Sequence, residues 1–383
     1  MANRNFFKSG SDRSRLSRQE QKKGYQDPKK VEDHWYIFSK AVYVEPNRRN
    51  IPAWLLPLIV LLVLVLLIFW AAPTVISRIQ AFFQIGSVDN EEPVSLLYGD
   101  DTWTVCKPVA DVFAKDDLKA GRLTQALYNE PVLIVSDDCT YGFAYVRLAD
   151  GSEGYMRTAD LADSRSSIEP DLFSHKLVIA ETTKRILSHA SRGTLLVEVP
   201  MGTVLFADYR GSGISRVALP GGDVGWIGDD GVIILEPTGT IEPVANGARY
   251  FSSTALAFNQ ITILPNGQSV YGISTMGIAR LAGAINGITL PRLLPDLAAS
   301  GQPADLRINE ETGLIEADSI KAGDLVFLGD PGTPDVPVEM GVCVADGQIL
   351  YAGPGQTSVR LVDLVVNPDL LRRILFVRRL YWF

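Results

Sequence analysis

One long apolar run constrains the fold of this chain more than any other feature. No charged residue occurs between Leu55 and Trp70, and the apolar segment with its flanks covers residues 51–73. A helix of about 20 apolar residues crosses a hydrocarbon core of roughly 30 Å. Trp54 and Trp70 stand at its ends, where indole rings prefer the membrane interface. We therefore expect a transmembrane helix over 51–73 rather than a buried core helix.

Charges on the two sides of this run predict its orientation. Residues 1–50 are rich in Lys and Arg, whereas acidic residues follow the run and the whole chain has a net charge of −8. The positive-inside rule places a basic tail, 1–50, in the cytoplasm and everything after the helix outside, beginning with a linker over 74–95. The run lies too far from the N-terminus for a cleaved signal peptide, so we expect an uncleaved signal-anchor. The acidic balance argues against a nucleic-acid partner.

Three cysteines bear on an extracytoplasmic location. Cys106 and Cys139 fall in one small predicted domain, and an outside location permits them to form a disulfide. Cys343 lies in an apolar run and is expected to be a core residue. No Cys or His spacing is typical of zinc, so neither a metal nor a cofactor is expected.

Two β-rich blocks, 96–165 and 166–242, follow the same plan. Each has a strand, a turn containing Asp or Gly, and then a Gly-aromatic-aliphatic triplet. The first contains a strand at 143–148, Asp150-Gly151 and Gly154-Tyr155-Met156; the second contains a strand at 215–219, Gly221-Gly222 and Gly225-Trp226-Ile227. Such turns favour tight hairpins, and the recurrence indicates an internal repeat.

The last block, 243–383, mixes helical and strand patterns. Helices are predicted over 252–260 and 276–285 from apolar residues at three- and four-residue spacing. A strand is predicted at 324–328, and a hairpin turns at Asp346-Gly347. Helices followed by an antiparallel sheet indicate an α+β domain. The expected fold is thus multi-domain, with one N-terminal transmembrane helix, two small β-barrels and a C-terminal α+β domain.

The two β-rich blocks resemble the bacterial SH3-like domain, whose pattern is V-x-L, a D-G turn and then G-W-V. The last block resembles the NlpC/p60 family, bacterial endopeptidases of papain-like fold that cut peptidoglycan stem peptides. Its matching segments are Gly272-Ile273 with Gly277 (G-I-x-x-x-G), residues 287–292 (G-I-x-L-P-R), residues 320–327 (L-x-x-G-D-L-V-F) and Met340-Gly341-Val342 with Asp346-Gly347 (the family's V-G-I and D-G hairpin).

The resemblance fails at the positions that carry catalysis. It implies that Thr275 replaces the nucleophilic Cys, Glu339 the His and Tyr351 the third polar residue, with all three facing one cleft. Ser274, Leu293 and Leu294 replace polar residues of the family groove, and no histidine follows His189. Thiol–imidazole chemistry needs both groups, and a carboxylate of ordinary pKa is a poor base for a threonine hydroxyl. We therefore expect no catalytic residue.

These features favour a binding function over turnover. Our interpretation is an extracytoplasmic pseudoenzyme, held by one span in a bacterial cell membrane, that acts as a cell-envelope scaffold for peptidoglycan or a protein partner. One alternative is a regulator that recruits or sequesters an active cell-wall hydrolase. Another is a peptidoglycan endopeptidase with an unorthodox nucleophile.

Overall fold

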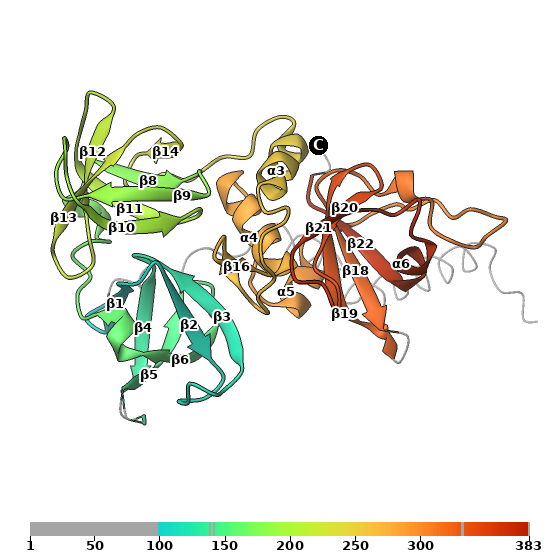
Figure 1. Ribbon diagram of the computed structural model, residues 1–383, viewed down its shortest axis with the longest axis horizontal. Coiled ribbons are helices and arrows are strands. Elements are labelled where there is room, and N and C mark those ends of the chain that lie inside the picture. The colour runs from blue at the N-terminus through green and yellow to red at the C-terminus, as the bar shows by residue number, and fades with distance from the viewer. Residues whose placement is uncertain (1–98, 138, 141, 331–332, 382–383) are drawn as a thin grey trace, which may run out of the picture. The chain divides into compact units, whose positions relative to one another are not determined.

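The computed structural model describes residues 99–137, 139–140, 142–330 and 333–381 (Figure 1). The predicted cytoplasmic tail, transmembrane helix and linker lie outside these residues and stay predictions. Among the residues that the structure describes, no helix is long and apolar enough to cross a membrane.

The first block folds into a seven-stranded antiparallel sheet of order β3-β2-β6-β5-β4-β1-β7. Buried and half-buried residues alternate along β5, as expected for a strand with one face on a core. That core includes Val105, Val112, Val146 and Met156. The strands are β1 (Thr102–Val105), β2 (Val109–Phe113), β3 (Arg122–Leu127), β4 (Pro131–Ser136), β5 (Phe143–Leu148), β6 (Glu153–Arg157) and β7 (Leu161–Ala162), with a 3-10 turn η1 (Thr158–Asp160) before the last.

The second block repeats this topology strand for strand. Its order is β10-β9-β13-β12-β11-β8-β14, which is the first order with each strand number raised by seven. The predicted repeat is therefore confirmed. After η2 (Pro170–Leu172), its strands are β8 (His175–Ile179), β9 (Thr183–Leu187), β10 (Leu195–Pro200), β11 (Val204–Gly211), β12 (Ile214–Ala218), β13 (Val224–Gly228) and β14 (Val232–Leu235).

The expectation of two closed β-barrels is wrong, because the described strands at the two ends of each sheet do not pair with each other. Within the described residues, no pairing joins the end strands β3 and β7, or β10 and β14, so both sheets are open. The outer edge of β3 instead accepts hydrogen bonds from the last block. The Asn266 side chain donates to the Arg122 carbonyl over 2.8 Å, and Arg292 donates to the Gln125 carbonyl over 2.6 Å. These contacts occupy edge carbonyls that closure would require.

The last block is an α+β domain, as predicted. Its six-stranded antiparallel sheet has the order β17-β22-β18-β19-β20-β21. The predicted second helix agrees with α4, whereas α3 begins and ends earlier than expected. The elements are α3 (Gly247–Leu256), β15 (Gln268–Ser269), β16 (Gly272–Ile273), α4 (Thr275–Ile285), α5 (Leu294–Ala299), β17 (Gln302–Pro303), η3 (Ala317–Ser319), β18 (Asp324–Asp330), β19 (Thr333–Ala345), β20 (Gln348–Tyr351), β21 (Arg360–Asp363), α6 (Pro368–Arg373) and β22 (Ile374–Arg379).

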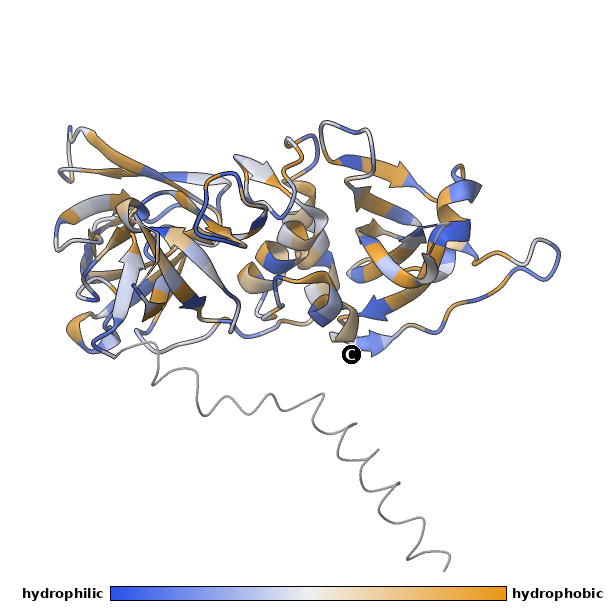
Figure 2. Cartoon of the chain, turned by 90° about the horizontal axis from the view of Figure 1, so that it is seen from below, coloured by the Kyte–Doolittle hydropathy of each residue, from blue (hydrophilic) through white to orange (hydrophobic). Residues whose placement is uncertain are grey.

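Helix α4 is where the three blocks share a core. Leu127 of the first sheet and Met201 of the second belong to one buried cluster with Ile278 and Leu281 of α4. Gly202, with a positive φ of 87°, lies against Leu281, and a side chain there would collide with it. Hydrophobic residues, orange in Figure 2, occur along the strands of the three large sheets as well as on the helices.

Candidate functional site

The start of α4 is the position that the sequence predicts for a nucleophile. Ser274 caps the helix: its hydroxyl accepts a hydrogen bond from the Gly277 amide and donates one to the Gly267 carbonyl, both over 3.1 Å. Thr275 follows as the first helical residue and is 7% exposed. Gly277 packs against the Gly267 carbonyl, where no side chain would fit. The glycine motif therefore holds this helix start close to the preceding loop.

Glu339 and Tyr351 meet, as the sequence analysis expects, but with a partner that it did not single out. The Tyr351 hydroxyl donates to the Glu339 carboxylate. Arg373, at the end of α6, donates to the same carboxylate over 2.8 Å and to the Tyr351 hydroxyl over 3.2 Å. The Arg373 and Glu339 side chains are 24% and 23% exposed, so the ion pair is largely removed from water.

The described contacts do not bring Thr275 to Glu339 and Tyr351, so the expected shared cleft stays a prediction. No hydrogen bond or ion pair among the described residues joins Thr275 to either partner. Met340 and Leu350 pack in the core cluster of α4, whereas Tyr351 packs in a second cluster. Side chains alternate between the two faces of a strand. Glu339 and Tyr351 therefore lie on the sheet face opposite to α4, which motif matching along the chain does not reveal.

The electrostatics of this trio favour a fixed structural contact. Burial, together with the hydrogen bond to Glu339, raises the pKa of Tyr351 to about 12. Burial opposes the charge of Arg373, but the bonds to Glu339 and Tyr351 outweigh it and raise the pKa of the guanidinium. At neutral pH the phenol is protonated and the carboxylate is paired with a cation. Both groups are thus bonded to each other and to Arg373.

The two groove leucines stand at the start of α5. Leu293 precedes the helix and is 40% exposed, whereas Leu294 is partly buried against the α4 core cluster. The structure thus spreads the predicted site residues over three places: the start of α4, the start of α5 and the far sheet face.

Arg292, from the predicted G-I-x-L-P-R segment, forms a contact between blocks. Its side chain is 1% exposed and binds Asp150 over 2.6 Å and also Glu130, both in the first sheet's block. Burial opposes ionisation of Asp150, but the Arg292 charge and hydrogen bonds from Ser152 hold its pKa below the ordinary value. The Asp of the predicted Asp150-Gly151 turn is therefore an ion-pair partner of the last block as well as a turn residue.

The structure does not contain the predicted disulfide. Cys106 and Cys139 are free thiols that contact different carbonyls, those of Ala159 and Ser136. The register of β1 on β4 pairs Thr104 with Pro131, so Cys106 lies about ten residues along the ladder from Cys139. At about 3.3 Å per residue, this separation far exceeds the reach of a disulfide.

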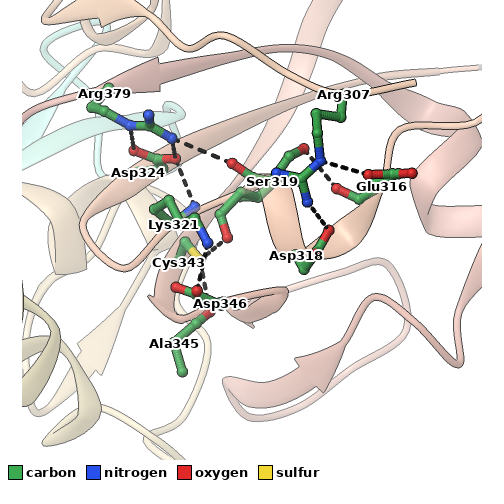
Figure 3. A network of polar contacts seen from close by, with 11 residues as sticks. Arg307, Glu316, Asp318, Ser319, Lys321, Asp324, Cys343, Ala345, Asp346 and Arg379 are labelled. Atoms are coloured by element: carbon green, nitrogen blue, oxygen red, sulfur yellow. Dashed lines mark hydrogen bonds and ion pairs between the residues drawn. The ribbon is translucent and has the colours of Figure 1, made fainter. Parts of the chain in front are cut away.

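Cys343 is a core residue, as the sequence predicts. It is fully buried, and its thiol donates to the Ala345 carbonyl over 3.0 Å (Figure 3). Burial raises its pKa to about 12, which leaves no thiolate at neutral pH. Nearby, Asp324 of the G-D-L-V-F segment is 1% exposed and forms a two-pronged pair with Arg379 at 2.9 and 2.8 Å. This motif residue therefore stabilises the sheet.

Neither of the two described histidines makes a hydrogen bond or ion pair with Thr275, Glu339 or Tyr351. His175 and His189 belong to the second block and contact the neighbouring hydroxyls of Ser174 and Ser188. Over the described ranges, no cluster of three His, Cys, Asp or Glu side chains is arranged to hold a metal.

Comparisons with known proteins agree with this architecture. A family model described as the bacterial dipeptidyl-peptidase SH3 domain matches residues 113–161. An NlpC/P60 family protein from Bacillus cereus ATCC 10987 superposes with a TM-score of 0.62 at 17% identity, covering 73% of this chain and 99% of that one. An NlpC/P60 endopeptidase from Photobacterium damselae subsp. piscicida gives 0.52 at 11% identity, covering 76% of each chain. No curated protein matches the sequence.

The described part of the chain is therefore an NlpC/P60-type fold with a bacterial SH3-like domain, as the motifs predict. The sequence did not point to Arg373. Nothing in the Arg372-Arg373 pair predicts that Arg373 is half-buried against Glu339 while Arg372 is exposed. The sequence also did not predict the role of Arg292, although the motif containing it was identified.

Proposed function

We propose that this protein is a catalytically inactive relative of cell-wall peptidases that binds peptidoglycan or a protein partner in the bacterial cell envelope. The observation that carries the proposal is the state of Glu339. In the position expected for the catalytic histidine, a carboxylate is bonded to Arg373 and Tyr351. A general base must be free to take a proton, and this group is not.

The nucleophile position supports the same proposal. A threonine hydroxyl attacks only when a base removes its proton. No described hydrogen bond links Thr275 to a basic side chain, and the last block contains no histidine. With the SH3-like fold ahead of it, the last block is better suited to holding a ligand than to cutting one.

The proposed location outside the membrane rests on the sequence. The apolar run 51–73 follows a basic tail, which favours a cytoplasmic N-terminus and an extracytoplasmic remainder. A reporter that is active only in the cytoplasm is expected to work when fused before residue 40 and to fail when fused after Phe383. The reverse pattern would remove peptidoglycan as a ligand.

Turnover and binding are tested separately on the purified full chain. We expect no hydrolysis of muropeptides, while the protein co-sediments with purified cell walls or retains an envelope protein from membrane extract. Retention of an active wall hydrolase would favour the regulatory alternative. Hydrolysis that disappears in Thr275→Ala but persists in Ser300→Ala, which removes a half-buried hydroxyl after α5, would overturn the proposal in favour of an unorthodox peptidase.

A further inference from the structure

A cavity of about 770 Å³ lies beside α4, where the last block meets both SH3-like blocks. This volume is within the range typical of small-molecule sites. Much of its wall is apolar, with Leu127 from the first block, Val178 and Phe206 from the second, and Leu290 from the last. Neither Thr275 nor Glu339 lines it, so the cavity is distinct from the degenerate catalytic positions.

Two cations, Arg280 and Lys176, line this cavity without a hydrogen bond or close ion pair to a described residue. Arg280 lies in the middle of α4, and Lys176 lies on β8. Burial and the nearby Arg292 charge lower the pKa of Arg280 to about 10, against the opposing charges of Glu130 and Asp150. Burial also lowers the pKa of Lys176. Arg280 stays charged at neutral pH. A charge beside apolar walls is costly unless it is paired.

The charges of Glu130 and Asp150 act on Arg280, but no described hydrogen bond or close ion pair joins either carboxylate to it. Glu130 and Asp150 both bind Arg292, the third cation of the lining. Glu242 stands exposed and accepts a hydrogen bond from the Thr240 hydroxyl over 3.0 Å. No described residue therefore accepts a hydrogen bond from the N–H donors of the Arg280 guanidinium.

We propose that this cavity binds a ligand that carries a carboxylate on an apolar body. Arg280 holds the carboxylate through paired N–H donors, a geometry that suits a guanidinium better than an ammonium. Lys176 adds a second positive charge, and the leucine, valine and phenylalanine walls cover the apolar part. The inference does not depend on the proposed function, since the site lies apart from the degenerate catalytic positions.

Matched probes test the charge requirement on the full wild-type chain. N-acetyl-leucine and N-acetyl-leucinamide share an apolar body, and only the first has a carboxylate. We expect the acid to bind at least about tenfold more tightly by ligand-observed NMR, the size of one charged hydrogen-bond pair. Hexanoate carries a carboxylate but no amide, so it shows whether the site needs a peptide-like end or only an acid. Binding of either N-acetyl-leucine or hexanoate supports the site. Equal binding of acid and amide, or no binding of either acid, would overturn the proposal.

Two variants locate the carboxylate. Arg280→Met should abolish the preference for the acid, whereas Arg280→Lys should keep a reduced preference, because the charge remains without the fork. Arg249→Met, which changes an exposed arginine on α3 outside the cavity, should behave as wild type. Circular dichroism on each variant checks folding. A full preference retained in a folded Arg280→Met protein would refute the assignment.

Discussion

At the scale of single residues, two of the predicted site positions, Glu339 and Tyr351, take part in a polar contact with Arg373. Glu339, Tyr351 and Arg373 form a closed set in which each group bonds to the other two. Such a set is stabilising only while all members are present, because a missing partner leaves a partly buried polar group without its bond.

Glu339→Gln should lower the free energy of unfolding by about 1–2 kcal/mol, since Arg373 loses its anionic partner. The measurement is urea denaturation of the full chain. Glu316→Gln is the matched control, because its pair with Arg307 is far more exposed, at 36% and 57%. Its effect should be clearly smaller. If both variants lowered the free energy of unfolding equally, the Glu339 contact would stabilise the protein no more than an exposed ion pair does.

The raised pKa of Tyr351 predicts a defined pH dependence. A phenol in the unfolded chain ionises near pH 10, whereas burial and the Glu339 contact raise the folded pKa to about 12. The folded protein therefore keeps a proton that the unfolded chain releases. The resulting stability is fully present below pH 10 and is lost as the pH rises toward 12.

The Tyr351→Phe variant has no phenol group and therefore no proton that ionises in this pH range. The advantage of wild type over Tyr351→Phe should therefore shrink by about 2 kcal/mol between pH 10 and pH 12. Denaturant titrations over this range measure it, and phenolate absorbance reports the ionisation directly. Parallel stability curves for the two proteins would contradict the assignment of the shift to Tyr351.

At the scale of elements, α4 is the helix on which the domain is assembled. Its first turn is capped by Ser274 and held against the Gly267 carbonyl, and its apolar face supplies Ile278, Leu281 and Ala282 to the shared core. The cap matters because the first amides of a helix have no partner within the helix.

Ser274→Ala should destabilise the protein by about 1 kcal/mol, the usual cost of losing a helix cap. Thermal unfolding followed by circular dichroism measures the loss. Ser300→Ala is the control, because that hydroxyl bonds an exposed carbonyl near the end of α5. A melting temperature unchanged by Ser274→Ala would mean that water replaces the cap at no cost.

At the scale of the whole molecule, Arg292 links the last block to the first SH3-like block. It bonds one backbone carbonyl and two carboxylates while only 1% exposed. Removing one member of a buried ion-pair network usually costs more than forming it contributes, because the remaining charges lose their partner.

Arg292→Met should therefore cost about 3 kcal/mol and separate unfolding of the first SH3-like block from that of the last. Calorimetry of the full chain should show an additional, earlier transition. Arg307→Met, which removes a surface ion-paired arginine, should leave the transitions of wild type in place. A single unchanged transition in Arg292→Met would show that the apolar core alone couples the blocks.

Local sequence patterns determined much of this protein. The Asp/Gly and Gly/Gly turns, the repeat of two blocks, helix α4 and the G-D-L-V-F strand follow from short-range rules of turn geometry and hydrophobic period, and they agree with the structure. That Thr stands at position 275 and that no histidine follows His189 is also readable from the chain alone. Each of these depends on residues that are close in sequence.

Only the tertiary structure decided which side chains meet. The separation of Cys106 from Cys139 depends on the register of β1 on β4, and the sheet face of Glu339 depends on how α4 packs. Arg373 reaches Glu339 across 34 positions, and Arg292 reaches Glu130 across 162. These contacts are set by strand register and by packing between distant segments. Turn residues and hydrophobic periodicity carry no information about strand register or about packing between distant segments.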